Sequence, residues 1–156
     1  WEYAARAGSD TPLSYGTLDV DFSPYANMAD EALQALDTCT GGVMVLLDFP
    51  ARMDVNDGAI VTNDVGSYRP NAWGLYDMHG NAAEWTRTSV DGTNADQYNG
   101  DSSRDSSKIV RGGSFRDRPE RCQSAYRLDY PGWRHVHNVG FRIILESTDN
   151  ETIASK

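Results

Sequence analysis

Apolar residues recur at helical spacing in two short stretches of the chain. Residues 1–7 have the pattern of the last turns of a helix, and Gly8 follows at the position where a helix commonly ends in a left-handed residue. In residues 29–36 the apolar side chains fall on one side, which predicts a short amphipathic helix. These apolar positions are Ala29, Ala32, Leu33 and Leu36.

Three apolar runs have the length and pattern of β-strands. Residues 43–47 form a compact apolar run after two glycines and predict a buried strand. Residues 108–115 and 139–145 predict two strands of a central sheet. The last run has the alternation of a half-buried strand. Its alternating apolar positions are Val139, Phe141, Ile143 and Leu145.

Polar stretches mark the loops and the end of the folded region. Residues 91–107 are dense in Asp, Ser, Asn and Gly, a composition that predicts an exposed loop. Residues 147–156 are polar and predict a frayed tail or a linker. We therefore expect one folded unit over residues 1–146, followed by that tail.

Composition and charge narrow the classes of function. The chain has 156 residues, enough for one domain, and 39% of them are apolar, enough for a hydrophobic core. Its 14 glycines, with abundant Asp, Asn and Ser, favour a loop-rich fold over a helical bundle. The formal net charge of −9 argues against nucleic acid and anionic membranes as partners, and it suits divalent cations. No apolar run has the length needed for membrane insertion.

The cysteines and histidines define no framework by themselves. Cys39 and Cys122 are the only cysteines, and two thiols neither establish nor exclude a disulfide. The three histidines are not spaced for a structural zinc site. His135 and His137 could share a transition metal if they lay on a strand, but two polar residues on a loop is the simpler interpretation.

The segment from Gly74 to Trp85 has the residues of a cation-binding loop. It contains two acidic residues, two glycines and an asparagine between large apolar residues. Calcium takes about six to eight oxygens from carboxylates, amides and backbone carbonyls on a chain that bends around it. Asp77 and Glu84 could supply the carboxylates. The alternative is that Asp77 caps a turn and Glu84 pairs with an arginine such as Arg111.

Four segments resemble, in order, the signature segments of the formylglycine-generating enzyme (sulfatase-modifying factor) family. They are residues 1–8, 74–85, 110–115 and 138–142. The resemblance implies a loop-rich α+β fold related to C-type lectin domains, with few short strands and helices. Because Trp1 matches a point well inside the family's domain, we expect residues 1–146 to be the C-terminal part of such a domain.

The resemblance also implies two calcium sites. The positions that match the first are Asp77, Gly80, Ala82 and Glu84. The positions that match the second are Asn27, Met28, Asp57 and Ala59. We expect both ions to be structural and to tie loops together. Because calcium is abundant outside the cytoplasm, a periplasmic or extracellular location is expected.

The catalytic residues implied by the resemblance are incomplete. Catalytic members hold copper(I) on two cysteines that follow a Gly-Gly-Ser-aromatic motif, and soft thiolates suit that ion. Asp117 stands at the first position, and Cys122 falls at the second when counted forward from Phe115 but not when counted back from residues 140–142. Ala83 stands where catalytic members carry a tryptophan. Copper binding is therefore not expected.

Two residues remain candidates for catalysis, each with a simpler alternative. Cys122 could be a reactive thiol, although a lone cysteine is more often a packing residue. Ser114 matches a serine of the family, although no His–Asp pair nearby makes it a hydrolase nucleophile.

Arginine and aromatic side chains crowd between the last two predicted strands and predict a binding surface for a peptide, a protein or a small anionic ligand. The alternative is that the aromatic residues pack under the loop while the arginines pair with Asp117, Glu120 and Asp129. The residues assigned to the surface are Arg116, Arg118, Trp133, Arg134, His135 and His137.

These observations favour a calcium-stabilised, non-catalytic recognition or accessory module, which could act within a larger protein or complex. The alternative is an oxidoreductase of the formylglycine-generating or sulfoxide-synthase type that uses Cys122 or a metal from another domain. A hypervariable lectin-like binding protein is a third option, but residues 116–138 lack the asparagine-rich composition typical of such proteins.

Overall fold

A small mixed sheet and three short helices are joined by long loops in the computed structural model, which describes residues 1–39, 51–90 and 107–145. This is the expected α+β architecture. The helices are α1 (Glu2–Arg6), α2 (Glu31–Cys39) and α3 (Pro119–Cys122). The strands are β1 (Ala83–Ser89), β2 (Ser107–Arg111), β3 (Leu128–Pro131) and β4 (Val139–Phe141).

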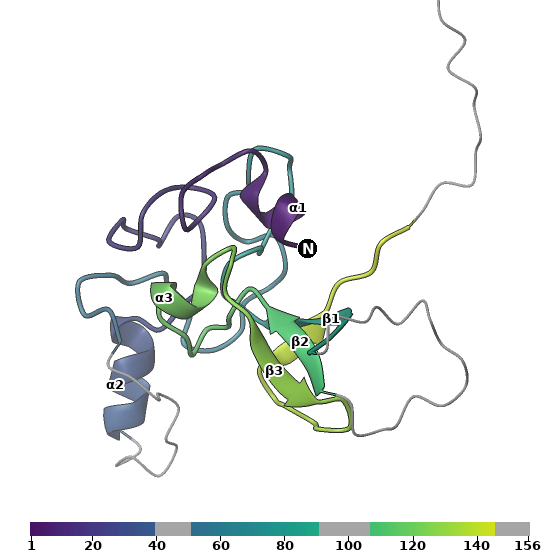
Figure 1. The fold of residues 1–156 in the computed structure, drawn as a ribbon. Coiled ribbons are helices and arrows are strands. Elements are labelled where there is room, and N and C mark those ends of the chain that lie inside the picture. The colour runs from purple at the N-terminus through teal and green to yellow at the C-terminus, as the bar shows by residue number, and fades with distance from the viewer. Residues whose placement is uncertain (40–50, 91–106, 146–156) are drawn as a thin grey trace, which may run out of the picture.

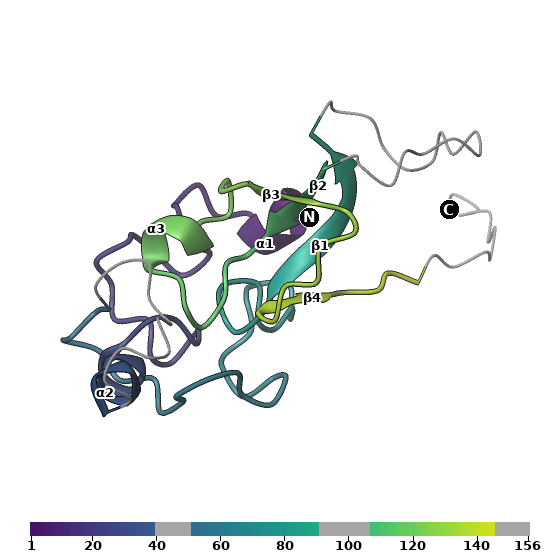
Figure 2. The same cartoon turned by 90° about the horizontal axis from the view of Figure 1, so that it is seen from below.

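The sheet has the strand order β3-β2-β1-β4. β2 pairs antiparallel with both β1 and β3, whereas β4 lies parallel to β1 at one edge. Figures 1 and 2 show the sheet at one end of the molecule and α2 at the other, with α3 between them.

Both predicted helices exist, with shifted ends. α1 ends where expected, although the left-handed conformation begins at Ala7 (φ 46°) and continues at Gly8 (φ 90°). α2 begins at Glu31, two residues after the predicted start. The reason is a side-chain cap, because Asp30 Oδ1 accepts the backbone N–H groups of Ala32 and Leu33 at 2.9 and 3.1 Å.

The two predicted strands of the sheet are shorter than expected. β2 ends at Arg111 because Gly112 and Gly113 take positive φ values of 89° and 66°, which leave the strand conformation. β4 ends at Phe141, and the half-buried alternation predicted up to residue 145 is wrong. Ile143 and Leu145 are 74% and 91% exposed.

The position of β4 explains that exposure. It is an edge strand that pairs only with β1, so among the described residues it has no neighbour on its other side. The chain leaves the ladder at Arg142, whose guanidinium turns to Glu84 and to the Tyr76 carbonyl.

Several other predictions have different outcomes. β1 and β3 were not predicted, and residue 107, assigned to a loop, begins β2. The predicted strand at 43–47, the predicted loop over 91–106 and the tail at 147–156 lie outside the described residues.

Loops, more than helices, surround the buried core. One cluster brings together side chains from distant loops and α3, and a second packs α2 against the turn after β2. The first contains Leu13, Phe22, Ala26, Met28, Val55 and Cys122. The second contains Ala29, Leu33, Ala51 and Phe115. No helix in the described part of the chain is long and apolar enough to cross a membrane.

Asn81 ties these loops together. Its backbone N–H donates to the Asn27 carbonyl at 2.7 Å, and its carbonyl accepts the Phe115 N–H at 3.0 Å. Its side-chain oxygen accepts the Asn63 N–H at 2.9 Å, and its amide donates to the Asn63 carbonyl at 3.1 Å. Since Asn81 is 5% exposed, these bonds satisfy its buried polar groups and hold the segment of residues 74–85 in place.

Candidate functional site

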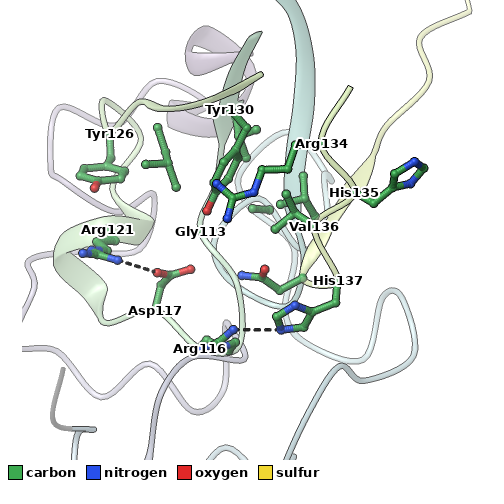
Figure 3. A pocket seen from close by; sticks show the side chains of 15 residues that line it. Gly113, Arg116, Asp117, Arg121, Tyr126, Tyr130, Arg134, His135, Val136 and His137 are labelled. Atoms are coloured by element: carbon green, nitrogen blue, oxygen red, sulfur yellow. Dashed lines mark hydrogen bonds and ion pairs between the residues drawn. The ribbon is translucent and has the colours of Figure 1, made fainter. Parts of the chain in front are cut away.

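A cavity of about 210 Å³ opens between the turn after β2, α3, β3 and the loop that leads into β4 (Figure 3). Its lining is rich in arginine, histidine and tyrosine. The lining residues with polar side chains are Arg116, Asp117, Arg121, Tyr126, Tyr130, Arg134, His135, His137 and Asn138.

Asp117, which stands where the resemblance implies the first copper ligand, is held by its own turn. The Ser114 hydroxyl and backbone N–H donate to Asp117 Oδ2 at 2.7 and 3.0 Å. The Asn138 amide donates to the Ser114 hydroxyl at 2.8 Å, and Arg121 Nη1 lies 3.6 Å from Asp117 Oδ1. Ser114 therefore orients the Asp117 carboxylate, and among the described residues its hydroxyl has no histidine partner that would activate it as a nucleophile.

Cys122 has the environment of a packing residue. Its side chain is fully buried in the first core cluster, and the thiol lies 3.8 Å from the Asp117 carbonyl. Burial raises the pKa of the Cys122 thiol well above its usual value. Since the thiolate is the reactive form and the ligand form of cysteine, this thiol is poorly placed for both roles.

The residues present do not fit a copper(I) centre. One oxygen of Asp117 accepts two hydrogen bonds from Ser114 and the other faces Arg121, and only one thiol is near. Hard carboxylate oxygens are poor ligands for copper(I). Within the described residues no group of three or more His, Cys, Asp and Glu side chains could hold a metal ion, so His135 and His137 form no such centre with His79.

Four of the six residues predicted for the ligand surface line this cavity: Arg116, Arg134, His135 and His137. Two do not. Arg118 is not part of the lining and lies 3.6 Å from Glu120, and Trp133, also outside the lining, is 60% exposed. Asn138 also lines the cavity but was not predicted to belong to the surface, although it begins the 138–142 segment that carries part of the family resemblance.

Two arginines in the cavity have defined contacts. Arg116 Nη1 donates to His137 Nε2 at 2.9 Å, drawn as a dashed line in Figure 3. The Arg134 guanidinium lies over the Tyr130 ring, 5.2 Å from its centroid, at a distance typical of a cation–π contact. The ring of His135 points away from the cavity in Figure 3.

The first predicted cation site has one carboxylate oxygen suited to an ion. Asp77 takes a left-handed conformation (φ 55°), and its Oδ2 accepts the Gly66 N–H at 2.7 Å. Its Oδ1 is buried and has no hydrogen-bond partner. One cavity of about 610 Å³ is lined by Asp77, Ala82 and Glu84. Hard cations such as calcium bind carboxylate oxygens, and the unpartnered oxygen of Asp77 is of this kind.

Glu84 is already engaged. Arg142 Nη2 lies 2.7 Å from Glu84 Oε1, and the Trp1 indole N–H donates to Oε2 at 2.6 Å. Glu84 therefore forms an ion pair with an arginine, as the alternative interpretation predicted, but the arginine is Arg142 and not Arg111. Arg111 instead pairs with Glu2 at 2.8 Å. A cation here would share Glu84 with these donors or displace them.

Hydrogen bonds join three residues of the second predicted cation site. Asp57 Oδ2 accepts the Met28 N–H and Oδ1 accepts the Ala59 N–H, each at 2.9 Å. Burial raises the pKa of the Asp57 carboxyl to about 6, and the charge of Asp30 adds to this effect. Asn27 orients its amide toward the Val61 carbonyl at 2.8 Å. A cation beside Asp57 would favour its ionised form.

His79 joins two distant loops from inside the core. Its Nδ1–H donates to the Cys122 carbonyl at 2.8 Å, while Nε2 accepts the Ser14 N–H at 3.0 Å, so the ring is neutral. Burial lowers the pKa of His79.

We expect acid to destabilise the protein through His79. Because its pKa is lower in the folded state, stability is full above about pH 6.5 and falls as the unfolded chain takes up a proton below that value. Asp57 acts in the opposite direction, so wild type and His79→Gln should be compared at each pH by urea unfolding. The difference between the two should shrink between pH 7 and pH 5; a constant difference would contradict the assignment.

A family model described as the sulfatase-modifying factor enzyme 1-like domain (FGE-sulfatase) matches residues 1–147. The chain therefore belongs to this family. Over 88 residues it is 33% identical to the formylglycine-generating enzyme of Mycobacterium tuberculosis. The matched region covers 56% of this chain and 24% of that protein.

Two solved structures are similar over most of the chain. PvdO from Pseudomonas aeruginosa matches with a TM-score of 0.60 and 26% identity, over 90% of this chain and 47% of that one. Treponema denticola variable protein 1 matches with a TM-score of 0.59 and 26% identity, over 90% of this chain and 43% of that one. The chain thus spans less than half the length of these relatives, and the match confirms the fold class.

Proposed function

We propose that this chain is a calcium-stabilised, non-catalytic recognition or accessory module of the sulfatase-modifying factor family, which binds a peptide or a small anionic ligand in the cavity beside Asp117. The observation that carries the proposal is the state of Asp117 and Cys122. A carboxylate fixed by Ser114 and a fully buried thiol replace an accessible pair of thiolates.

The lining of the cavity supports recognition as its role. Arginine and tyrosine are enriched among the residues that contribute most to binding, because they combine large contact area with directed hydrogen bonds. Arg116, Arg121 and Arg134 reach one small cavity in a chain whose formal net charge is −9. This local excess of positive charge favours a ligand that carries negative charge.

Calcium has a structural role in this proposal. Asp77 would hold one ion with the backbone carbonyls of Gly80 and Ala82 and the side chain of Glu84. A second ion would be held by Asn27, Met28, Asp57 and Ala59. Bound calcium would supply positive charge among loops that have little regular secondary structure, and it would take no part in chemistry. The proposed calcium sites also favour a periplasmic or extracellular location. The module could act within a larger protein or complex.

The protein is expected not to convert cysteine to formylglycine. Mass spectrometry after incubation of a cysteine-containing sulfatase peptide with the protein, copper(I) and oxygen should show unmodified peptide, because the two-thiolate centre is incomplete. The Mycobacterium tuberculosis formylglycine-generating enzyme, under the same conditions, is the control. Formation of formylglycine by this chain would overturn the non-catalytic assignment.

A further inference from the structure

We infer that a groove on the face of the sheet that carries Arg127 is a binding site for a short extended peptide with one acidic residue and one branched apolar residue. This Arg127 groove has a volume of about 870 Å³, within the range common for ligand sites. It is separate from the cavity beside Asp117, so the inference does not rest on the proposed function. Its lining includes Trp1, Ile109, Arg111, Arg127, Ile143 and Ile144.

The Arg127 groove and the cavity beside Asp117 lie on opposite faces of the sheet. In β2, Val110 lines the cavity, whereas its neighbours Ile109 and Arg111 line the groove. Successive side chains of a strand point to opposite faces. A ligand in the groove would therefore contact a surface that the proposed function does not use.

One positive charge in the groove has no negative partner. The Arg111 guanidinium pairs with Glu2 at 2.8 Å, and the Arg142 guanidinium pairs with Glu84 at 2.7 Å. Arg127 is exposed, and within the described part of the chain it makes no hydrogen bond or ion pair. The two ion pairs are neutral overall, so Arg127 is the group that an anion would bind.

The position of Arg127 strengthens its preference for an anion. The register of β2 with β3 places Arg127, the residue before β3, opposite Arg111, the last residue of β2. Like charges opposite each other destabilise a sheet. Besides burial, the charge of Arg127 lowers the pKa of Arg111. Arg87, which also lines the groove, already interacts with other groups and supplies no free charge.

The other end of the groove is apolar. Ile143 and Ile144 follow β4 and are 74% and 84% exposed, so they offer a surface on which an apolar side chain can be buried. The Trp1 ring lies 5.3 Å from the Arg111 guanidinium carbon and adds an aromatic surface. Tryptophan and arginine are enriched among the residues that contribute most to binding.

The width of the sheet determines the length of the ligand. Arg127 lies beside β3 and Ile144 follows β4, and these are the two outer strands of the sheet. Neighbouring strands are about 4.8 Å apart, so three spacings give about 14 Å. An extended chain covers about 3.3–3.6 Å per residue. The acidic and the apolar residue of the peptide are therefore expected four positions apart.

A peptide suits the middle of the groove better than a fatty acid does. The groove is lined there by the two ion pairs and by Thr86, whose hydroxyl donates to the Ile109 carbonyl. An alkyl chain over these groups would remove them from water without offering hydrogen bonds. The amide groups of a peptide can replace those bonds, and its carboxylate can form two parallel bonds to the Arg127 guanidinium.

The test is a titration of the isotope-labelled protein with capped pentapeptides, followed by NMR chemical shifts. The probe is acetyl-Ile-Ser-Thr-Ser-Glu-amide, and the same residues in reverse order cover the other chain direction. Decanoate, an alkyl acid, is titrated in parallel. The better peptide should shift the indole N–H resonance of Trp1 and the methyl resonances of Ile144.

Changes in the peptide measure the contribution of each end. Replacement of its glutamate by glutamine should raise the dissociation constant about two- to fivefold, because the ion pair is exposed to solvent. Replacement of its isoleucine by serine should raise the dissociation constant about five- to tenfold, because an apolar contact is lost.

Two variants of exposed residues connect the affinity to the groove, and each has a matched control. Arg127→Gln should weaken the glutamate peptide to the level of the glutamine peptide, whereas Arg134→Gln, in the other cavity, should change neither. Ile144→Ser should weaken both peptides, whereas Leu145→Ser, at an adjacent exposed position outside the lining, should not. Dispersed spectra check that each variant is folded.

Four outcomes would overturn the inference. They are no shift of the Trp1 indole resonance with either peptide, equal affinities for the glutamate and glutamine peptides, an effect of Arg134→Gln as large as that of Arg127→Gln, and an effect of Leu145→Ser as large as that of Ile144→Ser. Binding of decanoate without binding of either peptide would overturn the peptide class. None of these results, except a dominant effect of Arg134→Gln, bears on the cavity beside Asp117, and that exception would support the proposed function.

Discussion

Replacement of Gly80 by alanine should lower the free energy of unfolding by about 3–5 kcal/mol, as the sum of overpacking and backbone strain. Gly80 has a φ of 79°, a conformation that residues with a Cβ rarely adopt. A Cβ atom there would also overlap the backbone carbonyl of Asn27, and backbone has little freedom to move away. The same carbonyl accepts the Asn81 N–H, so the damage would extend to the contacts of Asn81.

Gly74→Ala is the matched control for this prediction. Gly74 has a φ of 77°, almost equal to that of Gly80, but a Cβ atom there would meet nothing within 4 Å. The control should therefore lose only the strain of the left-handed backbone, about 1–2 kcal/mol. Chemical denaturation of both variants measures the difference. Equal losses would mean that the close approach of Gly80 to Asn27 contributes nothing.

Calcium should raise the free energy of unfolding by about 2.7 kcal/mol when its concentration is 100 times the dissociation constant of a single site. For a chain of this size, that corresponds to an increase in melting temperature of roughly 5–10 °C. The reason is that the proposed calcium sites exist only in the folded arrangement, in which the unpartnered Asp77 Oδ1 and the Asp57 carboxylate are held in place. Thermal unfolding with calcium or with a chelator measures the effect.

The calcium effect should also depend on pH. The pKa of Asp57 is raised to about 6, so in the metal-free protein this group favours the folded state at low pH. That contribution is lost as pH rises from about 4 through 6, because the unfolded chain ionises more easily. Calcium should offset this loss, and its stabilising effect should be larger at pH 7.5 than at pH 5, where protons compete for Asp57.

Single substitutions connect the effect to each site. Asp77→Asn and Asp57→Asn should each reduce the calcium-dependent increase in melting temperature, whereas Asp10→Asn, the same change at an exposed position, should leave it intact. A melting temperature that does not respond to calcium at any pH would remove calcium from the proposed function.

Local signals in the sequence predicted the helices well. Apolar spacing indicated α2, and its start moved only because Asp30 caps it two residues later than the pattern implied. The presence of β2 and β4 was also predicted from short local patterns, in the case of β4 from the alternation of apolar residues over 139–145. Their ends were not, because Gly112 ends β2 through backbone conformation and Arg142 leaves β4 for a partner that is distant in sequence.

In the candidate site, too, the sequence indicated features that lie within one segment and did not indicate contacts between distant residues. The sequence placed Asp77 and Glu84 within one segment, and the structure shows that both line one cavity, while calcium binding there stays a prediction. The pairing of Glu84 with Arg142 was not predicted, since 58 residues separate them and the parallel pairing of β4 with β1 determines the contact. Likewise, the sequence indicated the arginine-rich region between the last strands, but it did not indicate that Arg118 lies outside the cavity.

The hydrogen bonds that Glu84 accepts from Trp1 and Arg142 affect how the chain folds. The Glu84 carboxylate joins Trp1, 83 residues earlier, to Arg142, 58 residues later. Contacts between residues so far apart in the sequence form only after large loops have closed. The entropy cost of closing these loops slows folding. The first helix and the last strand are therefore expected to dock late and together, so the cation loop between them acquires its final shape only at the end of folding.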